Sequence, residues 1–289
     1  TRSWPMVAPS MLRRDRRSWT RRGALRTGRG GEGRTDVVMR AALFAPCFVD
    51  QLAPGVAIAA VRLLERLGVE VALPEGAACC GQPPANAGDA RAGDAALRRF
   101  GETFAPYTHT IVLSGSCTTH VRQHASATGP AGATVAARSF EFCEFLHDVL
   151  GLDRVRALGA ADTRRVAVHI GCHALRGLQL ATPSERVLPP VNKVRAILES
   201  VHGLSFAPLQ RPDECCGFGG SFSVGEPAVS ARMGRDRLAD LRAGGADVVV
   251  STDVSCMLHL SGIERAAGGT LPMVHVAQLL AAACGLEER

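Results

Sequence analysis

The order of the cysteines constrains this chain more than any other feature of its sequence. Eight of the ten cysteines form two series, each with a single cysteine, a Cys-Cys-Gly triplet, and a cysteine followed three positions later by histidine. The two series are Cys47, Cys79, Cys80, Gly81, Cys117 and His120, and Cys172, Cys215, Cys216, Gly217, Cys256 and His259. Because the same residues recur in the same order with similar gaps, we infer an internal duplication. A chain of 289 residues is long enough for two such units.

The pattern of apolar residues repeats in step with the cysteines. In each half a strand leads to the first cysteine, a helix and a strand lead to the triplet, and a further helix and strand lead to the last cysteine. The strands are expected over 40–45, 69–73 and 110–113, and over 165–170, 204–207 and 248–250. The helices are expected over 56–67 and around 97–104, and over 189–201 and 227–241. This alternation predicts an α/β fold of two duplicated βαβ-type domains with mostly parallel sheets, over residues 39–150 and 164–283.

The cysteines fall just past the C-terminal ends of the predicted strands. In open α/β sheets this edge is where ligands bind. Cysteines that are distant in the sequence should therefore gather along one edge of the sheet. We expect one such site in each half.

The charge of the chain is unevenly distributed. The net charge of +6 comes from the arginines of residues 1–38, and the rest of the chain is close to neutral. Because the folded part lacks a basic footprint, we expect no nucleic-acid partner. Residues 1–38 are predicted to be a disordered Arg-rich tail: a transit peptide, a basic interaction arm, or an upstream extension from a start assigned too early, before Met39. No apolar stretch reaches the roughly 20 residues that a membrane-spanning helix needs, so no transmembrane segment is expected.

Several kinds of chemistry use cysteines in such numbers. A disulfide scaffold suits short secreted chains and does not fit this one. Inert buried thiols explain Cys143 and Cys284, which have no counterpart in the repeat. Zinc remains an alternative, but the adjacent Cys79 and Cys80 would reach one small ion awkwardly, whereas a cluster of several irons offers them separate positions. The spacing therefore favours iron–sulfur clusters over zinc, with Gly81 and its equivalent supplying backbone freedom beside the cysteines.

The histidines divide into recurring and single ones. His120 and His259 recur at matching places, so we consider them as cluster ligands or cluster neighbours. His169 and His173 flank Cys172 without counterparts in the first half, and we expect structural roles, with a cluster or substrate contact as the alternative. His275 is expected to be structural. Glu144, His147 and Asp148 are interpreted as the polar face of a helix around Cys143. No G-x-G-x-x-G follows a predicted strand, so no NAD or flavin is expected on this chain.

Seven segments carry a resemblance to a known family. They are F-x-P-C-F-x-D (44–50), C-C-G-Q-P (79–83), S-G-S-C (114–117), C-E-F-L (143–146), G-C-H (171–173), E-C-C-G-F-G-G-S-F (214–222) and S-T-D-V-S-C-M-L-H (251–259). Together they resemble the lactate utilization protein A branch of the cysteine-rich CCG-domain proteins, over about residues 40–283. Relatives of that branch include the CCG-domain component of heterodisulfide reductase and the iron–sulfur subunits of glycolate oxidase and anaerobic glycerol-3-phosphate dehydrogenase.

The resemblance implies two tandem CCG domains and a cytoplasmic iron–sulfur protein that works with two further lactate-utilisation subunits in oxidising L-lactate to pyruvate. Any association with a membrane would be peripheral and through those partners. The resemblance also implies that the electrons pass through one cluster per half and that the chain is a subunit of an oxidoreductase rather than a complete enzyme. The matching ligand positions are Cys47, Cys79, Cys80, Cys117, Cys172, Cys215, Cys216 and Cys256.

The chain departs from heterodisulfide reductase at one place in each half. There the domain ends C-x-x-C, and five cysteines hold a non-cubane cluster, whereas here the last position is His120 or His259. A [4Fe–4S] cluster with four cysteines or mixed ligands is therefore expected. The alternatives are a catalytic disulfide reductase, an iron–sulfur subunit of a glycolate or glycerol-3-phosphate oxidase, and a zinc-stabilised binding protein without redox function.

Overall fold

The computed structural model describes residues 39–286, and the predicted Arg-rich tail over 1–38 lies outside them. We call residues 39–156 the first half and residues 165–286 the second half. The strands of the first half are β1 (Met39–Phe44), β2 (Val69–Ala72), β3 (Thr110–Val112) and β4 (Ser139–Glu141). Its helices are α2 (Cys47–Leu52), α3 (Pro54–Arg66), α4 (Gln82–Asn86), α5 (Ala90–Phe104), α6 (Gly115–His124), η1 (Ala125–Thr128), α7 (Pro130–Arg138), α8 (Phe142–Glu144), the π-helical η2 (Phe145–Leu150) and α9 (Leu152–Arg156).

The second half repeats this order with fewer helices. Its strands are β5 (Arg165–His169), β6 (Ser205–Phe206), β7 (Val248–Ser251) and β8 (Met273–His275). Its helices are the π-helical η3 (His173–Gly177), α10 (Lys193–Leu198), α11 (Ser221–Gly225), α12 (Pro227–Ala243), α13 (Val254–Ala266) and α14 (Val276–Ala283). Among the described residues, no helix combines the length and apolar character needed to cross a membrane.

Each half contains one four-stranded sheet in which all neighbouring strands are parallel. The orders are β2-β1-β3-β4 and β6-β5-β7-β8, so the two halves share one topology. This confirms the predicted α/β fold of two duplicated units. The chain runs outward from β1 to β2 and returns to β3 on the other side of β1, which places a topological switch point between β1 and β3, and likewise between β5 and β7. Ligands of open α/β sheets bind at the C-terminal side of such a point.

The two central strands of each sheet are largely buried, as their continuous apolar runs predict, whereas β2 and β6 at the sheet edges are partly exposed. In β1, Ala41 and Leu43 face one core while Ala42 and Phe44 face another, following the two-residue period of a strand. The outer core of the first half lies under α5, α6 and α7, and that of the second half lies under α12 and α13.

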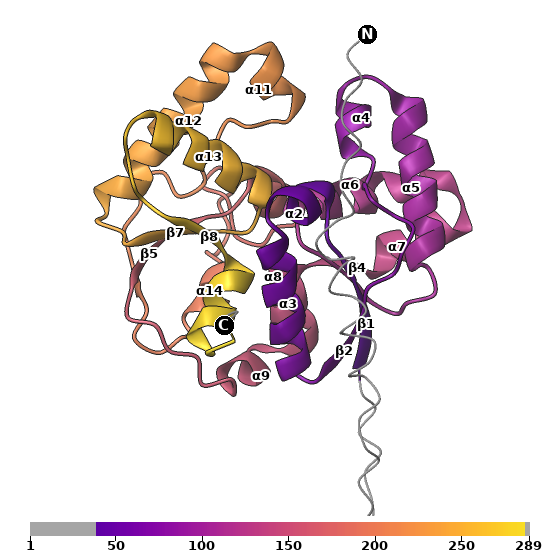
Figure 1. The fold of residues 1–289 in the computed structure, drawn as a ribbon, viewed down its shortest axis with the longest axis horizontal. Coiled ribbons are helices and arrows are strands. Elements are labelled where there is room, and N and C mark those ends of the chain that lie inside the picture. Colours follow the sequence, from indigo (N-terminus) through magenta and orange to yellow (C-terminus); the bar gives the residue numbers. More distant parts are fainter. Residues whose placement is uncertain (1–38, 287–289) are drawn as a thin grey trace, which may run out of the picture.

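The inner faces of both sheets contribute to a single apolar core. Between the sheets, α3 packs on α14, and α10 packs on α8 and η2; Figure 1 shows α3, α8 and α14 in this central layer. Because α3 and α10 each follow the first strand of their half, and α8 and α14 each follow the fourth, the two contacts are equivalent. The halves are therefore joined about an approximate two-fold axis, with helices of each half completing the core of the other.

Two local predictions differ from the structure. Helix α10 begins at Lys193 rather than at the prolines before it, because Ala181 and Asn192 form an antiparallel bridge and the Asn192 side chain caps the helix. Val191 is consequently 52% exposed instead of facing the core. Glu144 is not on a polar helix face: it is buried and accepts two hydrogen bonds from Arg122, at 3.0 and 2.7 Å.

Candidate metal centres

The four predicted cysteines of the first half meet at the C-terminal edge of its sheet. Cys47 opens α2 directly after β1, Cys117 lies in the first turn of α6 after β3, and Cys79 and Cys80 occupy the loop after β2. The Cys80 and Cys117 sulfurs are 3.0 Å apart, and hydrogen bonds between thiols link Cys47 to Cys79 and Cys79 to Cys80. Residues up to 70 positions apart in the chain thus form one set of sulfur donors.

The second half repeats the arrangement. Cys172 precedes η3, Cys256 lies in the first turn of α13, and Cys215 and Cys216 occupy the loop after β6. Thiol contacts connect Cys172 to Cys215, Cys215 to Cys216, and Cys216 to Cys256. In both halves, therefore, the structure brings together the four cysteines that the repeat singles out.

The glycine of each triplet shapes the loop that carries the two adjacent cysteines. Gly81 and Gly217 have φ angles of +92° and +85°, in the left-handed region that favours glycine. A Cβ atom at Gly81 would lie 2.6 Å from the Gly93 carbonyl oxygen, and one at Gly217 would lie 2.7 Å from the Ser230 carbonyl oxygen. The same two glycines donate their backbone N–H groups to the sulfurs of Cys79 and Cys215, at 3.3 and 3.4 Å.

The thiols of each set are electrostatically unequal. Hydrogen bonds from Cys47 and Cys80, and from the Gly81 amide, hold the pKa of Cys79 far below its usual range. The pKa of Cys215 is lowered in the same way by its neighbours in the second half. Hydrogen bonding to Cys79 and burial raise the pKa of Cys47, so the second negative charge in the set is strongly disfavoured. Four thiolates can coexist here only around cationic charge, and a soft metal or metal–sulfur cluster suits such a donor set.

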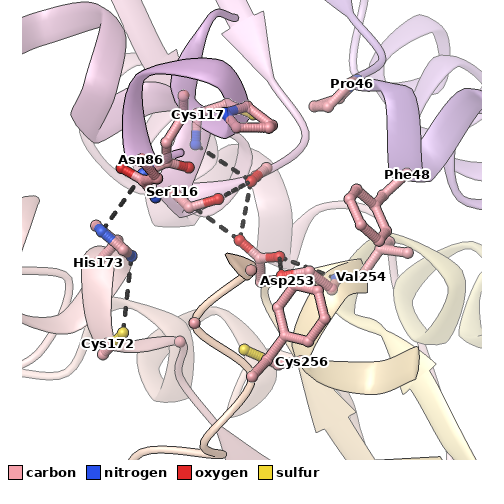
Figure 2. A pocket seen from close by; sticks show the side chains of 18 of the residues that line it. Pro46, Phe48, Asn86, Ser116, Cys117, Cys172, His173, Asp253, Val254 and Cys256 are labelled. Atoms are coloured by element: carbon pink, nitrogen blue, oxygen red, sulfur yellow. Dashed lines mark hydrogen bonds between the residues drawn. The ribbon is translucent and has the colours of Figure 1, made fainter. Parts of the chain in front are cut away.

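Both cysteine sets open into one cavity of about 550 Å³ between the halves (Figure 2). Sulfur-bearing residues of both halves line it, together with the aromatic rings of Phe48 and Phe218 and the polar residues Ser116, His173 and Asp253. Phe48 and Phe218 meet edge to face across the two halves, with ring centroids 5.8 Å apart. The expected two sites are therefore not separate pockets, because they share one cavity.

Asp253 connects the two halves beside the cavity. It is the N-cap of α13, where it accepts hydrogen bonds from the Ser255 N–H and hydroxyl, and it also accepts one from the Ser114 hydroxyl of the first half at 2.9 Å. Ser114 is in turn the N-cap of α6 and accepts from the Cys117 N–H. The helices that carry the last cysteine of each series are thus fixed to each other through their caps (Figure 2).

We expect Asp253→Asn to destabilise the protein, because a buried acceptor of several hydrogen bonds would be replaced by a group that offers one acceptor oxygen and a donor. The expected loss is about 1–3 kcal/mol, measured by denaturant unfolding of the metal-free protein. Asp153→Asn is the matched control, since that carboxylate is exposed and pairs with Arg156 at the surface. Equal unfolding free energies for the two variants would contradict a structural role for the Asp253 junction.

The two recurring histidines differ in their surroundings. His120 is buried, its Nε2 has no hydrogen-bond partner among the described residues, and burial lowers its pKa to about 4. His259 Nε2 lies 3.5 Å from the Ser230 hydroxyl and 3.4 Å from its carbonyl oxygen. Neither belongs to a group of potential ligand atoms within 4.8 Å of one another among residues 39–286. Ligation by His120 and His259 stays a prediction.

Iron release separates the two histidines experimentally. We expect His120→Ala to accelerate the loss of iron to a chelator more than His259→Ala, because of these two histidines only His120 has a buried ring nitrogen without a hydrogen-bond partner among the described residues. The wild-type protein and the exposed-site variant His202→Ala serve as references. Identical release rates in all four proteins would place both recurring histidines outside the metal environment.

Two histidines lie beside the cysteines of the second set: His173 Nδ1 is 3.7 Å from the Cys172 sulfur, and the other is His169. One of its ring nitrogens and the sulfurs of Cys216 and Cys256 lie within 4.8 Å of one another. Its Nδ1 accepts a hydrogen bond from Arg237 at 3.1 Å, and burial lowers its pKa to about 3, so the ring is neutral. The sequence favours a structural role for His169 and does not single out Arg237. His169 could have been found by comparing the two halves, because the first half has Phe44 at the equivalent position.

The remaining candidates lie away from the cavity. Cys143 is fully buried in the central core, and Cys284 follows α14 at the edge of that core. His275 caps α14 by accepting from the Ala277 N–H, while its Nε2 is 3.2 Å from the Thr252 carbonyl oxygen. His275 therefore has the structural role that was expected.

Comparisons with known proteins agree with this geometry. The pattern of the family described as "CCG: Cysteine-rich domain" matches residues 41–122 and 166–261, one segment in each half. The chain is 33% identical over 248 residues to "Lactate utilization protein A" of Shouchella clausii, which covers 84% of this chain and 98% of that protein. The proteins of the same name from Bacillus licheniformis and Bacillus subtilis are 34% and 33% identical, and each match covers 84% of this chain and 99% of the relative. The chain therefore belongs to the lactate utilization protein A family of cysteine-rich CCG-domain proteins.

Proposed function

We propose that this chain is the iron–sulfur electron-transfer subunit of a cytoplasmic complex that oxidises L-lactate to pyruvate. The observation that carries the proposal is that two four-thiol sets, one from each half, open into a single cavity. Two redox centres held in this way would be close enough for electrons to pass between them. The choice of lactate as the substrate rests on the relatives, which are named for lactate utilisation.

The donor set supports iron–sulfur clusters rather than zinc. In each half, two of the four thiols come from adjacent residues, Cys79 and Cys80 or Cys215 and Cys216, which suits the larger surface of a cluster better than one tetrahedral ion. The four cysteines of each series would hold the cluster, with His120 and His259 as candidate neighbours or ligands. An iron–sulfur cluster held there supplies one-electron transfer.

The residues around the cysteines suit this use. The backbone N–H groups of Gly81 and Gly217 donate to sulfurs of their own sets and favour the ionised form of these thiols. The rings of Phe48 and Phe218 place apolar surface in the lining of the cavity between the two sets. The Asp253–Ser114 hydrogen bond connects the helices that carry Cys117 and Cys256.

Oxidation of lactate to pyruvate removes two electrons and two protons, whereas a cluster accepts electrons singly. We therefore propose that the two-electron step takes place on a partner, and that this chain works with two further subunits. The described residues carry no dinucleotide fingerprint of the G-x-G-x-x-G kind at a strand–helix junction. The chain is thus proposed to carry electrons rather than to bind a nicotinamide.

Metal analysis tests the proposal directly. Protein purified without oxygen should be brown, should contain iron and acid-labile sulfide, and should give an EPR signal on reduction. A colourless protein with stoichiometric zinc would contradict the proposal and favour the zinc-stabilised binding protein.

The shared cavity favours a second candidate, a catalytic disulfide reductase. A space of about 550 Å³ flanked by both cysteine sets can accommodate a small organic disulfide. Its reduction would consume two electrons and two protons and yield two thiols, and the two cysteine sets would hold the clusters that supply the electrons. Rapid oxidation of the reduced protein by a small disulfide would support this function, whereas oxidation only by the lactate partners would exclude it.

A further inference from the structure

The end of the first strand and the helix beyond the triplet carry different residues in the two halves. Phe44 ends β1 and His169 ends β5, each three positions before the first cysteine of its series. The triplet glycines meet Gly93 in α5 and Ser230 in α12, so these two positions correspond. Two helical turns further along lie Phe100 and Arg237. The pair Phe44–Phe100 of the first half is therefore replaced by the pair His169–Arg237 in the second.

Both pairs are in direct contact. The rings of Phe44 and Phe100 pack edge to face with centroids 4.9 Å apart, and Phe104 completes an apolar cluster beside Cys80 and Cys117. In the second half, Arg237 Nε donates to His169 Nδ1 at 3.1 Å. An apolar contact beside the first cysteine set thus corresponds to a polar one beside the second.

Arg237 is anchored so that its guanidinium stays in place. Its side chain is 0% exposed and pairs with the buried carboxylate of Asp240 at 3.0 Å. It also donates to the carbonyl oxygens of Arg211, Val168 and Pro212. A buried arginine with this many partners is held in one orientation.

The orientation of Arg237 determines which nitrogen of His169 carries the proton. Because an arginine can only donate, His169 Nδ1 must be the acceptor, and the neutral ring then has its proton on Nε2. Nε2 is buried and has no hydrogen-bond partner among the described residues. One ring nitrogen of His169 lies within 4.8 Å of the sulfurs of Cys216 and Cys256. Because Nδ1 already accepts from Arg237, we infer that Nε2 is the nitrogen available to these sulfurs. Binding of iron at Nε2 would require loss of that proton beside the thiolates, so Nε2 is suited to donate and not to ligate.

We propose that, when a cluster is bound by the second cysteine set, His169, positioned by Arg237, donates a hydrogen bond from Nε2 to the thiolate sulfur of Cys216 or Cys256 and thereby raises the reduction potential of the second-half cluster above that of the first. Hydrogen bonds to cluster sulfurs withdraw negative charge and favour the reduced state. The proposal rests on the iron–sulfur function proposed above. It implies that electrons enter at the first half, beside Phe44 and Phe100, and collect at the second half before leaving the protein.

The test is an EPR-monitored redox titration of the full-length, anaerobically purified protein. The wild type should show two potentials. His169→Phe installs the residue of the first half and should shift the higher potential downward while the iron and sulfide contents stay unchanged. His169→Gln keeps an acceptor for Arg237 and a donor for the sulfurs, so it should restore much of the shift. Phe44→Leu, at the equivalent place in the first half, should leave the higher potential unchanged.

A second measurement covers the case in which these variants do not fold. Pulsed EPR on wild-type protein with isotope-labelled histidine should detect a weak nitrogen coupling and an exchangeable proton near the second-half cluster. The strong coupling of a directly bound nitrogen, or an unchanged higher potential in a fully loaded His169→Phe variant, would overturn the inference alone. A wild-type protein without iron or sulfide would instead overturn the proposed function.

Discussion

Serine in place of Cys80 or Cys216 should remove the cluster from its own half and leave the other half loaded. A serine hydroxyl is a far poorer ligand for iron than a thiolate, and both sulfurs are buried within their sets, in contact with two other thiols. The iron and acid-labile sulfide contents should each fall by about half, because one of two clusters is lost. Iron and sulfide assays on anaerobically purified variants, with EPR of the remaining cluster, measure this effect.

The chain offers a matched control in Cys143. It is as deeply buried as Cys80 and Cys216, but it lies in the central core and lines no part of the cavity. Cys143→Ala and Cys284→Ala should keep the full iron content. Loss of iron in either variant would mean that the ligand set differs from the two repeated series.

Damage to either half should abolish electron flow from L-lactate. If the two sites act in series, Cys80→Ser and Cys216→Ser interrupt the same path, and the double variant should be no worse than either single one. L-lactate-dependent growth of cells that rely on this protein is the measurement, with growth on pyruvate as the control for general fitness. Normal growth on lactate with both halves disabled would exclude electron transfer through this chain and leave a scaffold role.

Most of the fold could be predicted because the buried parallel strands leave continuous apolar runs beside the cysteines. The strands β4 and β8 could not, since each has three residues and β4 contains Ser139 and Glu141, which do not resemble a buried strand. The predicted start of α10 is wrong because a proline pair is a common helix start, and nothing local indicates the bridge between Ala181 and Asn192.

The eight cysteines could be identified because duplication marks them twice, but their common cavity could not. It depends on how the two halves pack against each other. Asp253 and Ser114 form a hydrogen bond between the halves, but in the sequence each of these residues is only a suitable helix cap. His169 and Arg237 could not be identified in this way, because a search for repeated residues discards positions that differ between the halves. Comparison of aligned positions, where Phe100 corresponds to Arg237, would have revealed a buried charge at an apolar place.

The two halves of this chain contact each other as the subunits of a symmetric dimer do. Helix α3 packs on α14, and α10 packs on α8 and η2 in the equivalent way. Symmetric dimers use the same patch on both subunits, and an ancestor with one half could have covered its central helices only against a second copy of itself. In such a homodimer every substitution appears at both sites at once. Fusion of the two copies removed that restriction, so one site could keep phenylalanines while the other acquired histidine and arginine. Covalent linkage of the halves thus allowed the residues beside the two cysteine sets to differ, as the proposed difference in reduction potential requires.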